Sequence, residues 1–157
     1  MSSKLKRTLQ DFLPPRQFEK FMICLIYLRG GDLKKIAELC KTDKHGSHYY
    51  IQHYQKYFTS LRWKRLNILE IGIGGLKDLM KGGASLRMWK YFFSWSNIYG
   101  IDIYDKSYHE ENRIKTFMGS QSDPDFLKEV ARKVGKIDIV IDDDSHINEH
   151  VIKTFKA

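Results

Sequence analysis

Residues 62–157 alternate short apolar segments with segments of helical periodicity, and this alternation constrains the fold more than any other feature. The strand-like segments lie in "RLNILEIGIGG", "NIYGIDIYD", "RIKTFMGSQSD" and "KIDIVIDDD". Strands that are buried on both faces read as nearly continuous apolar runs, and parallel strands need long connections that are usually helical. The pattern therefore predicts an α/β fold with a Rossmann-like, doubly wound sheet of about four parallel strands.

The helical segments carry their own boundary signals. They lie in "GGASLRMWKYFF", "DPDFLKEVARKVG" and "INEHVIKTF". Leu86, Trp89 and Phe93 recur on one side of the first segment. Asp123 followed by Pro124 predicts the start of the second, because Asp is a favoured N-cap and Pro suits the first helical position.

Residues 1–61 are predicted to form a helical region before the sheet, and residues 62–157 a partial cofactor-binding domain. In the first region a helix is expected to begin near Pro14–Pro15 and to end at Gly30–Gly31. Asp32 is a candidate N-cap for the next helix. The last helix of the region carries an aromatic stripe of Tyr50, Tyr54, Tyr57 and Phe58, which we expect to belong to the core.

The bulk properties suit one compact globular unit of 157 residues with a formal net charge of +8. The basic residues are scattered, so a solvated basic face explains the charge better than a nucleic-acid partner does. The longest apolar run, Phe21–Leu28, is too short to cross a bilayer, which needs about 20 residues, and no membrane partner is expected. This run is instead a core helix or a contact in a homo-oligomer.

The two cysteines, Cys24 and Cys40, lie in apolar helical patterns. No secretory signal or regular cysteine framework accompanies them. We therefore expect buried free thiols in a reducing, cytoplasmic compartment.

The glycine turn "LEIGIGG", Leu69 to Gly75, follows a predicted strand, where open α/β sheets bind their ligands. It lacks the second glycine of a phosphate-binding P-loop and the last glycine of a dinucleotide fingerprint. An acid, Glu70, stands just before the glycines and would repel a pyrophosphate. A cationic nucleoside such as S-adenosylmethionine, with its sulfonium and ammonium groups, suits Glu70 better.

Asp102 ends the next predicted strand, where an acid can accept hydrogen bonds from ribose hydroxyls. The alternative is that Glu70 only caps a turn and that Asp102 is solvated at the end of its strand. Because both acids follow consecutive strands, a nucleoside-binding site is favoured over this alternative.

Three successive acids, Asp142, Asp143 and Asp144, end the last predicted strand, which should neighbour the strand of the glycine turn. Like charges this close repel each other, and carboxylates are the ligands that Mg²⁺ prefers. His146 could then act as a general base toward an acceptor hydroxyl. The alternative is an exposed acidic loop that caps the following helix.

Five blocks in order resemble the macrolide-sugar O-methyltransferases, a family of class I S-adenosylmethionine-dependent methyltransferases that use Mg²⁺. They are "ELCKTDKHGSHYYIQHYQKYF", "NILEIGIGGLKDLMKGGASLRMWKYFF", "YGIDIYDKS", "GSQSDPDFL" and "DIVIDDDSHINEHVIKTF". The resemblance runs from about Glu38 to Phe155. It implies an O-methyltransferase that acts on the sugar hydroxyl of a small-molecule or glycosylated acceptor.

The resemblance also implies roles for individual residues. His146 would be the catalytic base and Asp143 a ligand of Mg²⁺, and Gln121 would lie near the adenine. The residues that would line the S-adenosylmethionine site are Thr42, Glu70, Gly72, Gly74, Gly75, Ser85, Asp102, Gln121 and Asp142.

The same resemblance implies two further metal ligands and further strands beyond Ala157, so we expect a C-terminally truncated chain whose last strand forms an apolar edge. Three hypotheses stay open. The first is a Mg²⁺-dependent sugar O-methyltransferase. The second is a non-catalytic remnant that still binds the cofactor. The third, suggested only by the charge, is a nucleic-acid methyltransferase, which no aromatic-basic motif supports.

Overall fold

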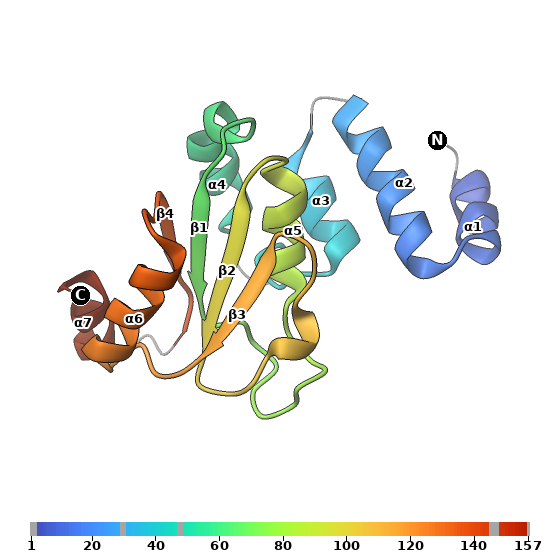
Figure 1. Ribbon diagram of the computed structural model, residues 1–157. Helices are drawn as coiled ribbons and strands as arrows, with labels where there is room; N and C mark the ends of the chain where they lie inside the picture. The colour runs from blue at the N-terminus through green and yellow to red at the C-terminus, as the bar shows by residue number, and fades with distance from the viewer. Residues whose placement is uncertain (1–2, 29–30, 47–48, 145–147, 157) are drawn as a thin grey trace.

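The computed structural model describes residues 3–28, 31–46, 49–144 and 148–156, and arranges them as helices around a four-stranded sheet (Figure 1). The helices are α1 (Ser3–Phe12), α2 (Pro15–Leu28), α3 (Leu33–Cys40), α4 (Ile51–Phe58), α5 (Ala84–Phe92), α6 (Pro124–Val134) and α7 (Asn148–Lys156), with short 3₁₀ helices η1 (Thr59–Leu61) and η2 (Ser107–His109). The strands are β1 (Asn67–Ile71), β2 (Asn97–Asp102), β3 (Ile114–Met118) and β4 (Ile139–Asp142). The predicted alternation of strands and helices is confirmed.

The strands run parallel in the order β3-β2-β1-β4, which confirms the predicted Rossmann-like sheet. Ile71 at the end of β1 lies opposite Ile101 in β2 and opposite Asp142 in β4. The carboxyl ends of β1, β2 and β4 therefore meet at one edge of the sheet, with the glycine turn beside the acids. Within the described residues β4 is an edge strand, and its Val140 is 50% exposed.

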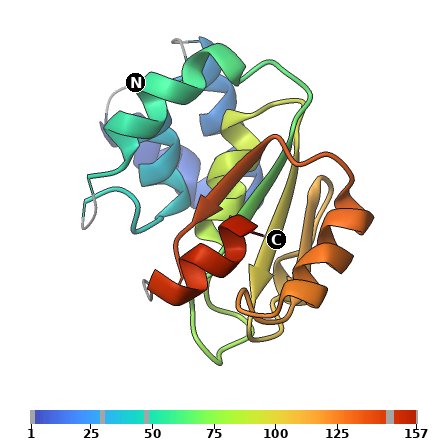
Figure 2. The same cartoon turned by 90° about the vertical axis from the view of Figure 1, so that its left-hand side faces the viewer.

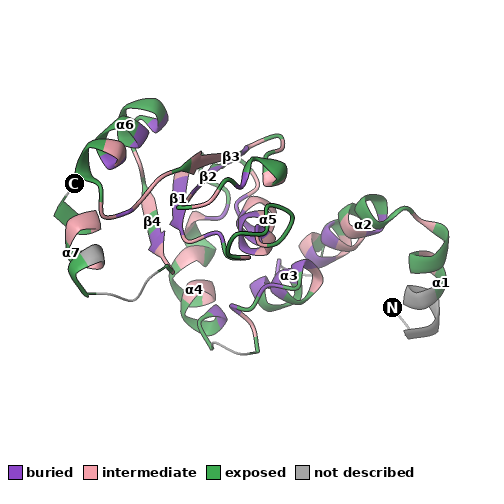
Figure 3. Cartoon of the chain, turned by 90° about the horizontal axis from the view of Figure 1, so that it is seen from below, coloured by how far each residue is buried: buried purple, intermediate pink, exposed green. Residues whose placement is uncertain are grey.

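Helices cover both faces of the sheet, as a doubly wound fold requires (Figure 2). Side chains alternate between the faces along each strand, so neighbouring residues of β1 join different cores. One core joins Ile68, Ile98, Ile114 and Ile141 to helices α2 to α5. The other joins Leu69, Ile71 and Ile101 to Leu127, Val130 and Val134 of α6. In Figure 3, the buried colour follows β1 and much of α5, the helix that packs against one face of the sheet.

The start of α3 confirms Asp32 as an N-cap, because its carboxylate accepts from the amide of Lys34 at 2.9 Å. Asp123 caps α6 in the same way. Helix α2 buries Ile23 and Ile26, but Cys24 points to solvent. Our expectation of two buried thiols is therefore wrong for Cys24 and confirmed for Cys40. The apolar composition of α2 did not show which of its faces is covered.

The aromatic stripe of α4 is confirmed only in part. Tyr54 and Phe58 pack against Trp89 of α5, with ring centroids 5.1 and 6.1 Å apart. Tyr57 is 64% exposed and Tyr50 is 40% exposed, so their assignment to the core is wrong. The two confirmed rings are spaced four residues apart and lie on the face that α5 covers, whereas Tyr57 lies off that face.

No helix in the described ranges is both long enough and apolar enough to cross a membrane. Helices α1 and α2 extend away from the sheet in Figure 1, and α2 packs against α3 and faces α5.

Candidate functional site

The turn after β1 is built by Gly72, Gly74 and Gly75, whose φ angles of 88°, 79° and 81° lie in the region that favours glycine. The amide of Gly72 donates to the carbonyl of Ile101 at 2.9 Å. A Cβ at Gly72 would lie 2.6 Å from the carbonyl oxygen of Asp143, whereas a Cβ at Gly74 would meet no atom within 4 Å. The turn thus packs against the loop after β4 at Gly72 and faces open space at Gly74.

Asp102, at the end of β2, holds this turn in place. Its Oδ2 accepts from the amide of Ile73 at 3.1 Å, and its Oδ1 accepts from the amide of Tyr104 at 2.9 Å. A carboxylate has about four acceptor positions, so these two bonds leave room for a ligand's hydroxyls. The predicted role of Asp102 toward a ribose stays a prediction.

Glu70 and Asp143 are brought together by a residue that the sequence analysis missed. The ammonium of Lys44 lies 2.9 Å from Glu70 Oε1 and also forms an ion pair with Asp143 Oδ2. The side chains of Lys44 and Glu70 are 2% and 0% exposed. Ser85, in the first turn of α5, donates to the other oxygen of Glu70 at 2.8 Å. Three predicted site residues and Lys44 therefore form one buried polar cluster.

The cluster shifts the ionisation of its members. Burial raises the pKa of Glu70 above its ordinary value, and the nearby Lys44 ammonium opposes this rise. For Lys44, burial favours the neutral amine, but the attraction of Glu70 and the contacts with Asp143 outweigh it and raise the pKa. Lys44 is therefore a firmly charged ammonium inside the site.

Thr42 lies at the base of the segment that carries Lys44. Its amide donates to the carbonyl of Ala37 at 3.2 Å as α3 ends, and Lys41 adopts a left-handed conformation with φ 58°. The amide of Lys44 donates to Thr42 Oγ1 at 3.4 Å. Thr42 is thus buried where the chain turns to direct Lys44 toward the sheet.

Gln121 and Asp142 meet on the other side of the strand ends. Gln121 Nε2 donates to Asp142 Oδ2 and to Thr154 Oγ1, both at 3.3 Å. Gln121 is buried, and its Oε1 has no hydrogen-bond partner within the described part of the chain. Asp142 and Asp143 thus face opposite ways, as the two-residue period of a strand requires.

The predicted metal site is not assembled by the residues that the structure describes. Among them no three His, Cys, Asp or Glu side chains are grouped to hold a metal ion. Asp143, the predicted metal ligand, is instead paired with Lys44. The predicted base, His146, lies outside the described residues, so its role stays a prediction.

A second buried lysine was also missed. Lys106 is 1% exposed, and its ammonium donates to the carbonyls of Leu76, Asp78 and Lys81 at 2.7, 2.9 and 3.3 Å. It thereby fixes the loop that links the glycine turn to α5. The one signal for Lys44 was indirect, since buried acids at the strand ends require a cation nearby.

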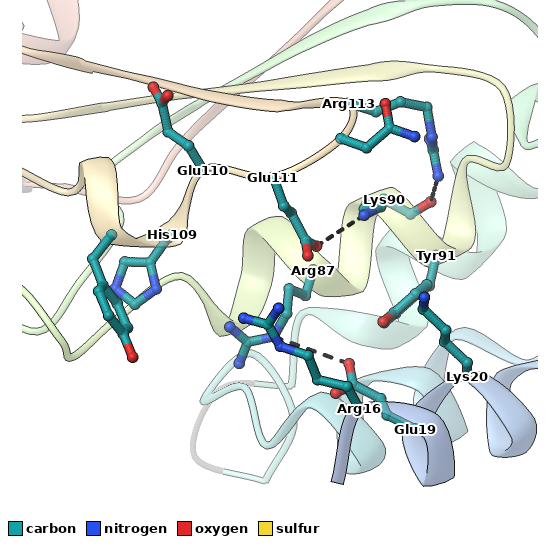
Figure 4. A pocket seen from close by; sticks show the side chains of 12 residues that line it. Arg16, Glu19, Lys20, Arg87, Lys90, Tyr91, His109, Glu110, Glu111 and Arg113 are labelled. Carbon is teal, nitrogen blue, oxygen red and sulfur yellow. Dashed lines mark hydrogen bonds and ion pairs between the residues drawn. The ribbon is translucent and has the colours of Figure 1, made fainter. Parts of the chain in front are cut away.

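A polar cavity of about 480 Å³ lies between α2, α5 and the segment before β3 (Figure 4). Ion pairs cross it, with Arg87 Nε 4.0 Å from Glu19 Oε1 and Lys90 Nζ 2.9 Å from Glu111 Oε1. None of the predicted site residues is among those that line it. The lining residues are Arg16, Glu19, Lys20, Arg87, Lys90, Tyr91, Tyr108, His109, Glu110, Glu111, Asn112 and Arg113.

Known proteins resemble this chain in both sequence and fold. Demethylmacrocin O-methyltransferase of Streptomyces fradiae is 50% identical over 127 residues, which are 80% of this chain and 32% of that enzyme. Mycinamicin VI 2''-O-methyltransferase of Micromonospora griseorubida is 48% identical over 130 residues, which are 82% of this chain and 33% of that enzyme. The resemblance to macrolide-sugar O-methyltransferases is confirmed.

The solved structure of MycE methyltransferase in complex with Mg, SAH and mycinamycin VI superimposes with a TM-score of 0.78 at 48% sequence identity. The match covers 80% of this chain and 35% of that one. The chain thus spans about a third of the length of the O-methyltransferases that it matches. No family model matches the sequence.

Proposed function

We propose that this chain supplies the cofactor-binding part of an S-adenosylmethionine-dependent O-methyltransferase that acts on a sugar or similar hydroxyl of a small-molecule or glycosylated acceptor. The observation that carries the proposal is the 48% identity and common fold with a methyltransferase solved with SAH, Mg and a macrolide. The division into a helical region of residues 1–61 and a cofactor domain of residues 62–157 belongs to the same proposal. Lys44 shows that residues before the sheet contribute to the polar cluster.

The described residues fit the cofactor. The glycine turn faces open space at Gly74, Asp102 retains acceptor positions, and Gln121 Oε1 is a buried acceptor without a partner in the described ranges. We propose that these groups bind the nucleoside, together with Thr42 and Asp142. S-adenosylmethionine, when bound, supplies an electrophilic methyl group to the acceptor oxygen, and the protein contributes mainly by positioning.

The described residues do not by themselves fit Mg²⁺, because Asp143 is paired with Lys44 and no other acids are grouped with it. The use of Mg²⁺, with Asp143 as a ligand and His146 as the base, remains a proposal that the similarity to MycE supports. The alternative is a chain that binds the cofactor without transferring a methyl group.

Calorimetry of this chain with S-adenosylhomocysteine and S-adenosylmethionine tests the proposal. Saturable binding is expected, and Gly74→Ala should weaken it at least tenfold because the new methyl group enters the open space beside the turn. Gly135→Ala is the matched control, since Gly135 has nearly the same φ of 78° and also meets no atom within 4 Å. Equal binding by the parent and both variants would contradict the assigned site.

An assay of methyl transfer to a glycosylated macrolide with a free sugar hydroxyl distinguishes an active enzyme from a chain that only binds the cofactor. Turnover by this chain establishes the enzyme. Tight binding of the cofactor without turnover establishes the non-catalytic alternative.

A further inference from the structure

Helix α2 is apolar on both of its sides, although the protein covers only one of them. On the covered side, Ile23 and Ile26 are buried in the core. On the opposite side, Phe21 is 40% exposed, Leu28 is 78% exposed and Cys24 is also exposed. A helix that is apolar all round is typical of the buried interior of a protein. The solvent-facing side of α2 therefore has the composition of a side that a neighbour covers.

The exposed apolar residues of α2 form one stripe, which we call the α2 face and which consists of Phe21, Cys24 and Leu28. These positions are three and four residues apart, so their side chains lie on one face of the helix. Gln17 extends the same face toward the start of α2 without adding a charge. Helix α1 does not reach the C-terminal half of α2 in Figure 1, so it leaves Cys24 and Leu28 uncovered.

The spacing of the α2 face fits a second copy of this chain. Around a twofold axis, residue i of one copy contacts residue j of the other, and residue j in turn contacts residue i. If two α2 helices run antiparallel with their α2 faces overlapping, Phe21 of each copy lies at the level of Leu28 of the other. Cys24 is within one residue of the midpoint, which is about 1.5 Å along the helix, and so lies beside the axis. The face is thus complementary to itself.

The charges of α2 favour the antiparallel orientation. A helix is stabilised by cations near its C-terminal end and not by cations near its N-terminal end. The last turn of α2 carries no basic residue, whereas the exposed side chains of Arg16 and Lys20 lie near its start. In the antiparallel pair, Lys20 of each copy lies at the level of the last turn of the other helix. Its ammonium then meets the negative end of that helix dipole.

We propose that the α2 face is the contact between two copies of this chain, which pack their α2 helices antiparallel about a twofold axis beside Cys24. The contact covers the apolar side of α2 that the single chain leaves in solvent. It goes beyond the proposed function, because no residue of the cluster at the strand ends takes part. Lys20 also lines the polar cavity between α2 and α5, so this cavity lies at the border of the contact.

The test is sedimentation equilibrium of this chain over a range of concentrations, and a reversible dimer is expected. Leu28→Lys should raise the dissociation constant of the dimer by at least about tenfold, because a charge enters the apolar contact twice. Leu28 is mostly exposed in the single chain, so the variant keeps its fold, which circular dichroism checks. Phe155→Lys is the matched control, since Phe155 is 88% exposed on α7, and its dissociation constant should equal that of the parent.

Lys20→Glu tests the orientation of the two helices. It places an acid at the negative end of the other α2 helix and should weaken the dimer as well. In a parallel pair, Lys20 would instead lie beside Lys20 of the other copy, and the substitution would exchange one like-charge pair for another. Lys128→Glu on α6 changes the net charge equally and should have no effect. A dimer that Lys20→Glu leaves unchanged or strengthens overturns the antiparallel contact.

A short bifunctional maleimide reagent tests the position of the twofold axis. It should link two copies through Cys24, and Cys24→Ser should abolish the link because Cys40 is buried. A dimer that is not linked in this way overturns the position of the axis at Cys24. A chain that stays monomeric at every concentration overturns the proposal and assigns the α2 face to a different polypeptide. A dimer that Phe155→Lys weakens and Leu28→Lys does not overturns it as well.

Discussion

Lys44 and Lys106 are both buried, yet their ammonium groups meet different chemistry. Lys44 lies between two carboxylates at the ends of β1 and β4. Lys106 lies under the loop between the glycine turn and α5, where three backbone carbonyls surround its ammonium. Two carboxylates can exchange one cation for another. Backbone carbonyls that are held by one lysine side chain instead fix the conformation of a loop. The first region, the polar cluster around Lys44, is therefore suited to respond to ligands. The second region, the loop around Lys106, is suited to keep one conformation.

Lys44→Met should have the largest effect on stability. It leaves Glu70 buried without its counter-charge, and breaking a buried ion pair in this way costs about 3–5 kcal/mol of the free energy of unfolding. Urea denaturation of the parent and the variant gives the difference.

Lys44→Met/Glu70→Gln is the matched control for this loss, because it removes the buried charge on both sides. We expect the double variant to recover part of the stability that the single variant loses. If the double variant is less stable than Lys44→Met by the full effect of Glu70→Gln alone, the two residues do not interact and the cluster is wrongly described.

Gly72→Ala tests how closely the first region is packed. The new methyl group would lie 2.6 Å from the carbonyl oxygen of Asp143, and φ is 88°. Left-handed backbone costs a non-glycine residue about 1–2 kcal/mol, and the displacement of the β4 loop should bring the total to about 3 kcal/mol. Gly74→Ala shares the strain in φ without the clash, so it should lose only about 1 kcal/mol. Equal losses in thermal unfolding would show that the loops after β1 and β4 do not meet at Gly72.

The sheet was predictable because its signals are local. Each strand is an apolar run, each helix has a cap or a stripe, and parallel strands place their carboxyl ends together. The meeting of Glu70 with Asp143 follows from that topology. The opposite orientations of Asp142 and Asp143 follow from the period of a strand.

The cation between those acids was not predictable from local pattern. Lys44 stands in the polar segment "TDKHG" and reads like any solvated lysine, since its burial depends on residues 26 and 99 positions away. We expected Glu70 to attract a cationic ligand, and the structure places the ammonium of Lys44 there. The predictions that Cys24 and Tyr57 are buried were wrong for a related reason. Periodicity shows that a helix has an apolar face, but it does not show how much of that face a neighbouring element covers.

Lys106→Met should cost less than the loss of Lys44, because it removes hydrogen bonds but leaves no buried charge behind. Hydrogen bonds to a charged group contribute about 1.5–3 kcal/mol each, and water can replace some of them in this loop, so we expect a loss of about 2 kcal/mol. Limited proteolysis should cut the variant within residues 76–82 faster than the parent. Faster cleavage at α3 or β4 instead would show that Lys106 does not act locally.

Asp102→Asn should have the smallest effect, and it probes the boundary between the two regions. Asp102 accepts from Ile73 in the glycine turn and from Tyr104 in the segment that leads to Lys106. Asparagine has one acceptor oxygen in place of two, so one of these bonds is lost at a cost of about 1 kcal/mol. Asp105→Asn, where the acid accepts from the nearby Ser107 and does not connect the two segments, is the control. Because Asp102 connects the turn to the loop, its variant should raise amide hydrogen exchange in both segments, whereas increased exchange in only one of them would show that the two regions are independent.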